Sequence, residues 1–194
     1  MRLSIRHGVT PAERAQAARL YWQAFGGKLG RVMGPERKAL AFIERVMDAD
    51  HVIVAADEAG TIAGVIGYRT QRSSFVGGTR ADLIAVYGHF GAFWRALALS
   101  VLAQDLAPGE ISVDGLAVRD TARGRGLGGA LLEALCREAQ MRGFALMRLD
   151  VVGENLRARA LYDRLGFQVS ARADSRLTAL IFGFRSRFAM ERAL

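Results

Sequence analysis

Residues 116–129 read LAVRDTARGRGLGG, the end of an apolar strand followed by a glycine-rich turn and the start of a helix. Glycines at such a turn let backbone amides approach phosphate oxygens, and the helix N-terminus adds the positive end of its dipole. Arg123 and Arg125 place further positive charge beside these amides. The stretch predicts a site for a phosphate-bearing ligand, the alternative being a flexible connection whose glycines only pack.

Two known types of phosphate-binding turn share glycines with this stretch. A nucleoside-triphosphate loop ends in Lys-Ser/Thr, whereas Gly129 is followed by Ala130, which excludes that family. The glycines do match a dinucleotide fingerprint, and Asp150 lies about 20 residues further on, where a ribose-binding acid belongs. However, Arg119–Arg123 separate the strand from the first glycine, and too little chain follows Asp150 for a doubly wound sheet.

Helical periodicity and capping residues predict five helices. Thr10-Pro11-Ala12-Glu13 forms a capping box, and Gly26-Gly27 is expected to end the first helix. The segment Arg69–Pro108 is interpreted as a loop followed by a helix. The expected helices are Pro11 to about Phe25, one opened by Gly34-Pro35, Phe90–Ala103, Gly126–Met141, and Asn155–Leu165 closed by Gly166.

Apolar and β-branched runs bounded by turn residues predict the strands. The turn Asp57–Gly60 joins the first two into an antiparallel hairpin, and Phe144–Val152 is apolar enough to be buried on both faces. The expected strands are His51–Ala56, Thr61–Tyr68, Glu110–Val118, Phe144–Val152, Phe167–Val169 and Ala179–Phe188. This order predicts an α/β (α+β) fold with a mixed central sheet flanked by helices.

Composition bounds the class of protein. With 194 residues, of which 51% are apolar and 24% charged, the chain can bury a core as one domain over residues 1–194. No stretch reaches the roughly 20 apolar residues of a membrane span, and no signal-peptide core follows the N-terminus, so a cytoplasmic protein that does not bind membranes is expected. The single Cys136 and three scattered histidines give no metal-ligand spacing, so no metal is expected.

The formal net charge of +8 favours an anionic partner. The basic residues are spread along the whole chain, without a compact block or an aromatic-flanked stripe. We therefore expect a small polyphosphate ligand rather than nucleic acid; a gathering of arginines on one face would favour nucleic acid instead.

Two motifs together resemble the GNAT superfamily of acyl-CoA-dependent N-acyltransferases. The first is a strand ending Leu-x-Val and then Arg-x-x-Gly-x-Gly, here Leu116-Ala117-Val118 and Arg123–Gly128. The second, an Asn followed by an aromatic-bearing helix and Gly-Phe, is present from Asn155 to Phe167. The resemblance is strong over Glu110–Phe167 and absent over Arg69–Pro108. It implies a sheet of six or seven strands in which the strand carrying Leu-x-Val splays from its neighbour.

The resemblance also implies an N-acetyltransferase that uses acetyl-CoA as cosubstrate in a ternary complex. Leu116 and Val118 then offer backbone groups to the pantetheine, and Asn155 makes a cofactor contact besides capping its helix. The pyrophosphate is wrapped by Arg123, Gly124, Arg125, Gly126, Leu127 and Gly128. Tyr162 resembles the general acid that protonates the departing thiolate, and an amide near Leu116 is the expected oxyanion donor.

The general base is predicted on the strand that leads into this site. Glu110 and Asp114 are the candidates, and Asp114 is chosen because it is closer to Leu116. Strict alternation puts Glu110, Ser112 and Asp114 on the same side as Leu116, unless a bulge near Gly115 reverses the register. A strand-end carboxylate paired with an arginine is the alternative role for Asp114.

The acceptor is expected to be a small-molecule or peptide amine. Aromatic residues of the first helices and of the Arg69–Pro108 excursion allow an apolar acceptor pocket, and the same surface is compatible with a homodimer interface. A non-catalytic acyl-CoA-binding module is the alternative function, and the presence of Tyr162 argues against it.

Overall fold

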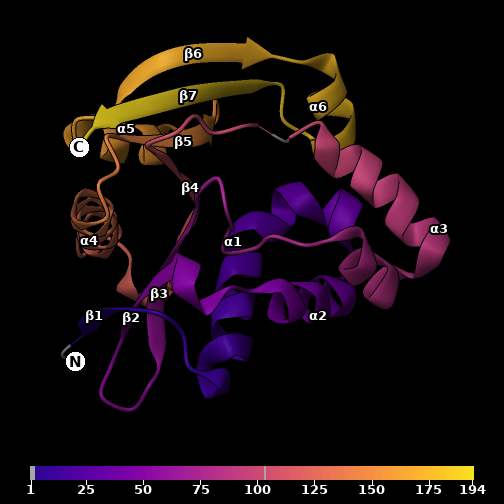
Figure 1. Cartoon of the computed structure of the whole chain (residues 1–194), viewed down its shortest axis with the longest axis horizontal. Coiled ribbons are helices and arrows are strands. Elements are labelled where there is room, and N and C mark those ends of the chain that lie inside the picture. The colour runs from indigo at the N-terminus through magenta and orange to yellow at the C-terminus, as the bar shows by residue number, and fades with distance from the viewer. Residues whose placement is uncertain (1–2, 103) are drawn as a thin grey trace.

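The computed structural model describes residues 3–102 and 104–194, and its centre is a seven-stranded mixed sheet (Figure 1). The strand order is β1-β2-β3-β4-β5-β7-β6, in which only β4 and β5 pair in parallel. The predicted hairpin of β2 and β3 is confirmed, whereas β1 was not predicted. The strands are β1 (Ser4–His7), β2 (Val52–Ala56), β3 (Ile62–Arg69), β4 (Glu110–Val118), β5 (Leu146–Val152), β6 (Gln168–Asp174) and β7 (Ser186–Ala193).

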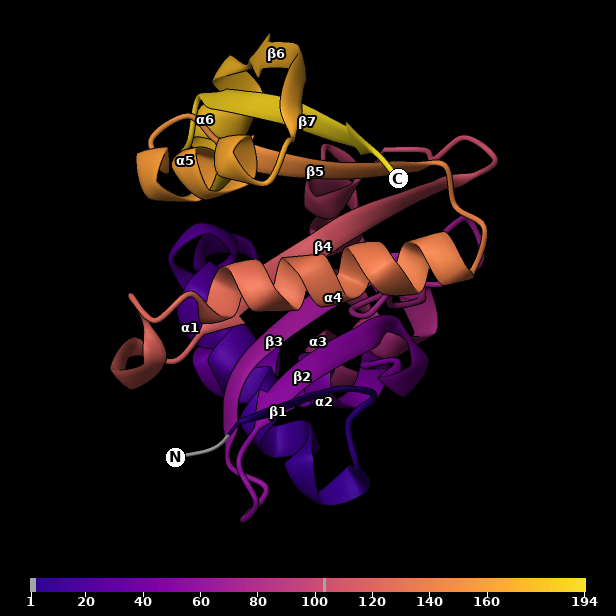
Figure 2. The ribbon, with the colours of Figure 1, turned by 90° about the vertical axis from the view of Figure 1, so that its left-hand side faces the viewer.

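Helices cover both faces of the sheet, as Figure 2 shows with α4 in front of it and α1 and α2 behind. One hydrophobic cluster joins α1, α2, α3 and α6 to the sheet, and a second joins α4 and α5 to its other face. No helix within the described residues is both long and apolar enough to cross a bilayer. The helices are α1 (Arg14–Met33), α2 (Glu36–Val46), α3 (Arg80–Ser100), α4 (Leu127–Met141), α5 (Leu156–Arg164) and α6 (Arg176–Phe182).

Two helix boundaries differ from the prediction. Helix α1 does not end at Gly26-Gly27 but continues to Met33, and a Cβ at Gly26 would lie 2.8 Å from the Trp22 ring, so this glycine makes room for the indole. Helix α3 starts at Arg80 rather than Phe90, and it is kinked at Gly88, whose φ is 72°. Its predicted end, Ala103, lies outside the described residues.

The C-terminal third also departs from the expected pattern. The strand predicted at Ala179–Phe188 is wrong, because Ser175 caps a helix there by accepting from the Thr178 amide at 3.3 Å and Gly183 closes it at φ 81°. The last strand, β7, follows this helix. The prediction that β5 is buried on both faces is wrong as well, since only alternate residues of it are buried.

Strands β4 and β5 separate part of the way along their length. They pair only from Glu110 to Val113 on β4 and from Leu146 to Leu149 on β5. Beyond this point β5 continues to pair with β7, while Gly115–Val118 pair with β3 alone. The expected mixed sheet of six or seven strands with a splayed strand pair is therefore confirmed, and it has seven strands.

Candidate functional site

A cleft of about 850 Å³ opens where β4 and β5 separate. Residues from both faces of the sheet line it, among them Tyr21 and Phe25 of α1 and Leu161 and Tyr162 of α5. Because these helices lie on opposite sides of the sheet, the cleft passes through the gap between the two strands. Its volume is in the range of about 300–1,000 Å³ that is typical of small-ligand sites.

The glycine-rich turn forms one end of this cleft. Gly124 and Gly126 both have a φ of 78°, which glycine adopts without strain, and a Cβ at either position would meet nothing within 4 Å. Gly126 precedes the 15-residue α4 and makes no side-chain cap, so the first amides of the helix are available to a ligand. Leu127 is buried beneath the turn, and Gly128 lines the cleft.

The two arginines of the turn have different surroundings. Arg123 donates from Nε to the Val118 carbonyl at 3.0 Å and pairs with Asp120 at 2.7 Å, so its guanidinium braces the turn as well as lining the cleft. Arg125 is exposed and is not among the cleft-lining residues. The structure thus brings Arg123, but not Arg125, into the site predicted from sequence.

Leu116 and Val118 lie on the splayed part of β4. Their side chains pack toward α4, coming within 3.7 and 3.8 Å of where a Cβ on Gly128 would stand. No strand of the described residues pairs with β4 here on the β5 side, so backbone groups pointing that way are open to the cleft. Any larger residue at Gly128 would contact these two side chains and Leu161.

Helix α5 supplies Asn155 and Tyr162. The Asn155 side chain accepts from the Ala158 amide at 3.1 Å, which is the predicted capping role, and it also lines the cleft. The Tyr162 ring is 9% exposed and packs at 6.0 Å from the Phe167 ring, while its hydroxyl makes no hydrogen bond to the described residues. Burial raises the pKa of Tyr162 to about 12, so the hydroxyl keeps its proton at neutral pH.

A β-bulge decides which way Asp114 points. Gly115 pairs with Gly67 and Val113 with Tyr68, which leaves Asp114 as the extra residue between them. The faces of β4 exchange at this residue, so Val113 and Leu116 both pack against the α4 side. The expectation that Glu110, Ser112 and Asp114 share a side with Leu116 is therefore wrong, and the reversed register is the one that forms.

Asp114 instead lies on the α1 side of the sheet, with its side chain 16% exposed. The Arg69 Nε is 3.7 Å from its carboxylate, and the Tyr21 hydroxyl donates to its backbone carbonyl at 3.5 Å. Burial raises the pKa of Asp114 to about 6, although the Arg69 charge and the backbone amides of Val76 and Phe75 act in the opposite direction. A carboxyl with this pKa can accept a proton near neutral pH.

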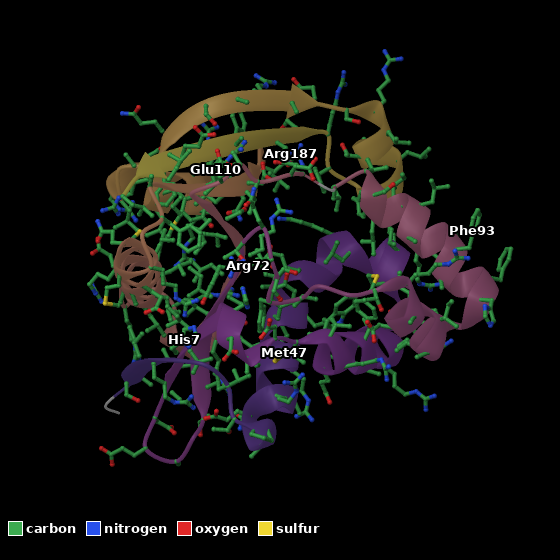
Figure 3. The ribbon with its side chains drawn as sticks, in the orientation of Figure 1. His7, Met47, Arg72, Phe93, Glu110 and Arg187 are labelled. Atoms are coloured by element: carbon green, nitrogen blue, oxygen red, sulfur yellow. The ribbon has the colours of Figure 1, made fainter. Side chains whose placement is uncertain are left out.

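The second candidate base, Glu110, is engaged elsewhere. It accepts from the Ala107 amide at 2.9 Å and from Arg148 at 3.0 Å, and these contacts hold its pKa below the usual range. Glu110 lies at the beginning of β4, visible in Figure 3, and is not among the residues that line the cleft. Ser112 is buried and does line it.

Sequence reasoning expected aromatic residues around the acceptor, but it did not place beside Asp114 the groups that surround it, which are Arg69, Tyr21 and the loop at Phe75. A signal was present in two glycines inside strands, which often mark a close approach of other groups. A Cβ on Gly67 would lie 2.2 Å from the Phe75 ring, and one on Gly115 would lie 2.5 Å from Phe25 and 2.9 Å from Tyr21.

Comparison with known sequences gives one family and one curated relative. The family model described as "Acetyltransferase (GNAT) family" matches residues 14–167. Mycothiol acetyltransferase from Beutenbergia cavernae is 46% identical over 77 residues, which are 40% of this chain. The match spans only 25% of that relative's length.

Solved structures resemble the whole chain. An N-acetyltransferase from Staphylococcus aureus Mu50 matches with a TM-score of 0.67, covering 97% of this chain and 100% of that chain at 17% identity. A GCN5-related N-acetyltransferase from Kribbella flavida matches with a TM-score of 0.63, covering 99% and 98% at 20% identity. At these identities the two structures demonstrate a shared fold.

Proposed function

The chain belongs to the GNAT family of acetyltransferases, and we propose that it transfers the acetyl group of acetyl-CoA directly to an amine acceptor in a ternary complex. The observation that carries this proposal is the cleft that passes between β4 and β5. One side of it offers the glycine-rich turn and the other the Tyr21 and Phe25 rings near Asp114, so two substrates can meet at the gap. We propose that residues 1–194 act as one such domain.

The residues around the turn fit the cosubstrate. The free amides at the start of α4, the open space beside Gly124 and Gly126, and the Arg123 charge suit a pyrophosphate. The backbone of Leu116 and Val118, which has no partner strand on the β5 side among the described residues, suits the amides of pantetheine. We also propose Asn155 and Arg125 as cosubstrate-binding residues. Asn155 lines the cleft, whereas Arg125 is exposed and reaches the phosphates only if its side chain moves.

When bound, acetyl-CoA supplies an acetyl group activated as a thioester. In the proposed reaction Asp114 takes a proton from the acceptor amine, directly or through water, as the amine nitrogen forms its bond to the acyl carbon. A backbone amide near Leu116 donates to the developing oxyanion. Tyr162 gives its proton to the sulfur as the carbon–sulfur bond breaks, so an amide and the free thiol are the products.

The positions of the two proposed catalytic groups support this division of roles. Tyr162 belongs to the hydrophobic cluster on the α4 face, and Asp114 lies toward α1, with the gap between the strands joining them. Acid and base are therefore on different sides of the proposed acyl position. The raised pKa of Tyr162 keeps its hydroxyl protonated, as a general acid must be before it donates, and an aspartate pKa of about 6 favours proton acceptance near neutral pH.

The test is an acceptor screen with acetyl-CoA that follows release of free thiol and identifies the acetylated product by mass. Amines, amino acids, aminoglycosides and peptide N-termini form the panel. Acceptor-dependent thiol release with a matching acetamide is expected. If coenzyme A binds but no acceptor releases thiol, the non-catalytic acyl-CoA-binding module is the better description.

A further inference from the structure

The half of the cleft beyond Asp114 is lined mostly by apolar side chains. It begins where the Tyr21 and Phe25 rings cover Gly115, the residue next to Asp114. From there Leu29 continues the same face of α1, four residues after Phe25. Three more apolar side chains complete this region, which we call the apolar pocket: Leu99, Leu102 and Phe184.

The apolar pocket is assembled from segments that are far apart in the sequence. Leu99 lies in the last turn of α3, Leu102 follows this helix, and Phe184 follows α6, which contacts α1. Phe25, Leu29, Leu99, Leu102 and Phe184 are all partly buried and pack against the core cluster on this face. These side chains therefore line the cleft from positions that pack against the hydrophobic core.

Charged groups in this half of the cleft are largely paired with one another. Asp150 accepts from Gln104 at 3.0 Å and lies 3.6 Å from Arg187, while Asp114 faces Arg69. Lys28 also lines this side, and burial lowers its pKa. With two carboxylates against three basic side chains, this half of the cleft does not favour an acceptor with several positive charges.

Resting on the proposed function, we propose that the acceptor is a monoamine bearing a bulky aliphatic or aromatic group, which lies in the apolar pocket while its nitrogen faces Asp114. Burial of the group supplies binding energy. Only the neutral amine is a nucleophile, and Asp114 is placed to take the proton from its nitrogen. The apolar pocket thus selects the acceptor and directs its nitrogen toward Asp114.

The first measurement compares n-hexylamine and 2-phenylethylamine with ethanolamine and spermidine, with saturating acetyl-CoA and detection of free thiol. Each methylene that enters the pocket is worth a factor of roughly four in kcat/KM, from about 0.8 kcal/mol per buried methylene. Hexylamine has four more carbon atoms than ethanolamine, so it should exceed ethanolamine by roughly two orders of magnitude when these carbons are buried. Preference for ethanolamine or spermidine, with thiol release intact, overturns this inference and leaves the proposed function standing.

The second measurement uses matched variants on one helix. Leu99 faces the cleft, whereas Leu97 is 65% exposed on the outer side of α3, where Phe93 also points away from the protein (Figure 3). Leu99→Asn should lower the hexylamine-to-ethanolamine ratio of kcat/KM at least tenfold, and Leu97→Asn should leave it unchanged. If Leu99→Asn does not fold, Leu102→Asn replaces it as the pocket variant. An equal hexylamine-to-ethanolamine ratio in all folded variants contradicts the proposal.

The apolar pocket can also be tested if the protein shows no acetyltransferase activity. If no amine releases thiol, the proposed function fails, and calorimetric binding of 2-phenylethylamine to the coenzyme A complex then tests the apolar pocket alone. Binding that is weaker in Leu99→Asn than in Leu97→Asn supports the pocket. No binding, or equal binding to both variants, overturns it.

Discussion

At the scale of single residues, the direction in which the Asp114 side chain points depends on a one-residue bulge in β4. The extra residue in β4 turns its carboxylate toward α1, where Tyr21 and Arg69 surround it and burial raises its pKa to about 6. Glu110, four residues earlier, is held by Arg148 with a lowered pKa. Two carboxylates on one strand thus have different proton affinities because their neighbours differ.

Asp114→Asn should remove the acidic limb of the pH–rate profile. If Asp114 is the base, kcat/KM of the unaltered protein falls as pH drops through about 6, because the carboxyl becomes protonated. The variant should lose roughly 10²-fold to 10⁴-fold in activity at pH 7.5 and show no limb near pH 6. An active variant with an unchanged profile assigns the base to another group.

The same substitution carries a stability signature. An unfolded aspartate has a pKa near 3.9, whereas the folded value is about 6. The folded state therefore binds more protons between these values, and the free energy of unfolding should fall as pH rises from about 4 to about 6. Urea unfolding across this interval should show that this fall is smaller in Asp114→Asn.

Tyr162→Phe separates packing from acid catalysis, because phenylalanine keeps the ring and loses one oxygen. If the hydroxyl protonates the thiolate, turnover should drop roughly 10²-fold to 10⁴-fold with coenzyme A affinity nearly unchanged, provided that chemistry limits the rate. Stability should change by at most about 1 kcal/mol. Turnover near that of the unaltered protein identifies Tyr162 as a core residue only.

At the scale of elements, the turn and α4 act as one unit. Glycines at φ 78° bring the chain into a helix whose first amides have no side-chain cap, and Leu131, Leu132 and Leu135 bury the helix on the sheet. A rigid helix thus presents free amides at a set place beside the gap between β4 and β5.

Gly126→Val should abolish coenzyme A binding, because the side chain takes the open space beside the turn. The left-handed φ also strains valine, at a cost of about 1–2 kcal/mol. Gly143→Val is the matched control, since Gly143 has a φ of 79° and equally open surroundings at the far end of α4. Thermal shifts should show similar destabilisation in both and loss of the coenzyme A response in Gly126→Val only; retained affinity in Gly126→Val excludes the turn as the pyrophosphate site.

At the scale of the whole molecule, a net charge of +8 and one cleft through the sheet favour a polyphosphate ligand. A ligand that binds only the folded state stabilises it by mass action. Coenzyme A at 100 times its Kd should add about 2.7 kcal/mol and raise the Tm by roughly 5–10 °C. NAD and ATP should not; stabilisation by NAD but not by coenzyme A revives the dinucleotide hypothesis.

Local sequence predicted the features that depend on local chemistry. The bounds of β4, the start of α4 at the glycine turn and the Asn155 cap were predicted because turns, caps and apolar periodicity involve residues within a few positions of each other. The family motifs in the same stretch predicted the splayed sheet. The helix at Arg176–Phe182 was missed because its short apolar run also fits a strand.

Tertiary structure alone decided the direction of Asp114, its proton affinity and the shape of the apolar pocket. The bulge at Asp114 is set by the pairing of its neighbour Gly115 with Gly67. Phe25 and Phe75 fill the space around it, and these partners are all distant in sequence. A single inserted residue exchanges the two faces of a strand, so alternation along β4 cannot reveal its side-chain directions. Burial, which sets the pKa of Asp114, exists only after α1 and the loop at Phe75 have packed on the sheet.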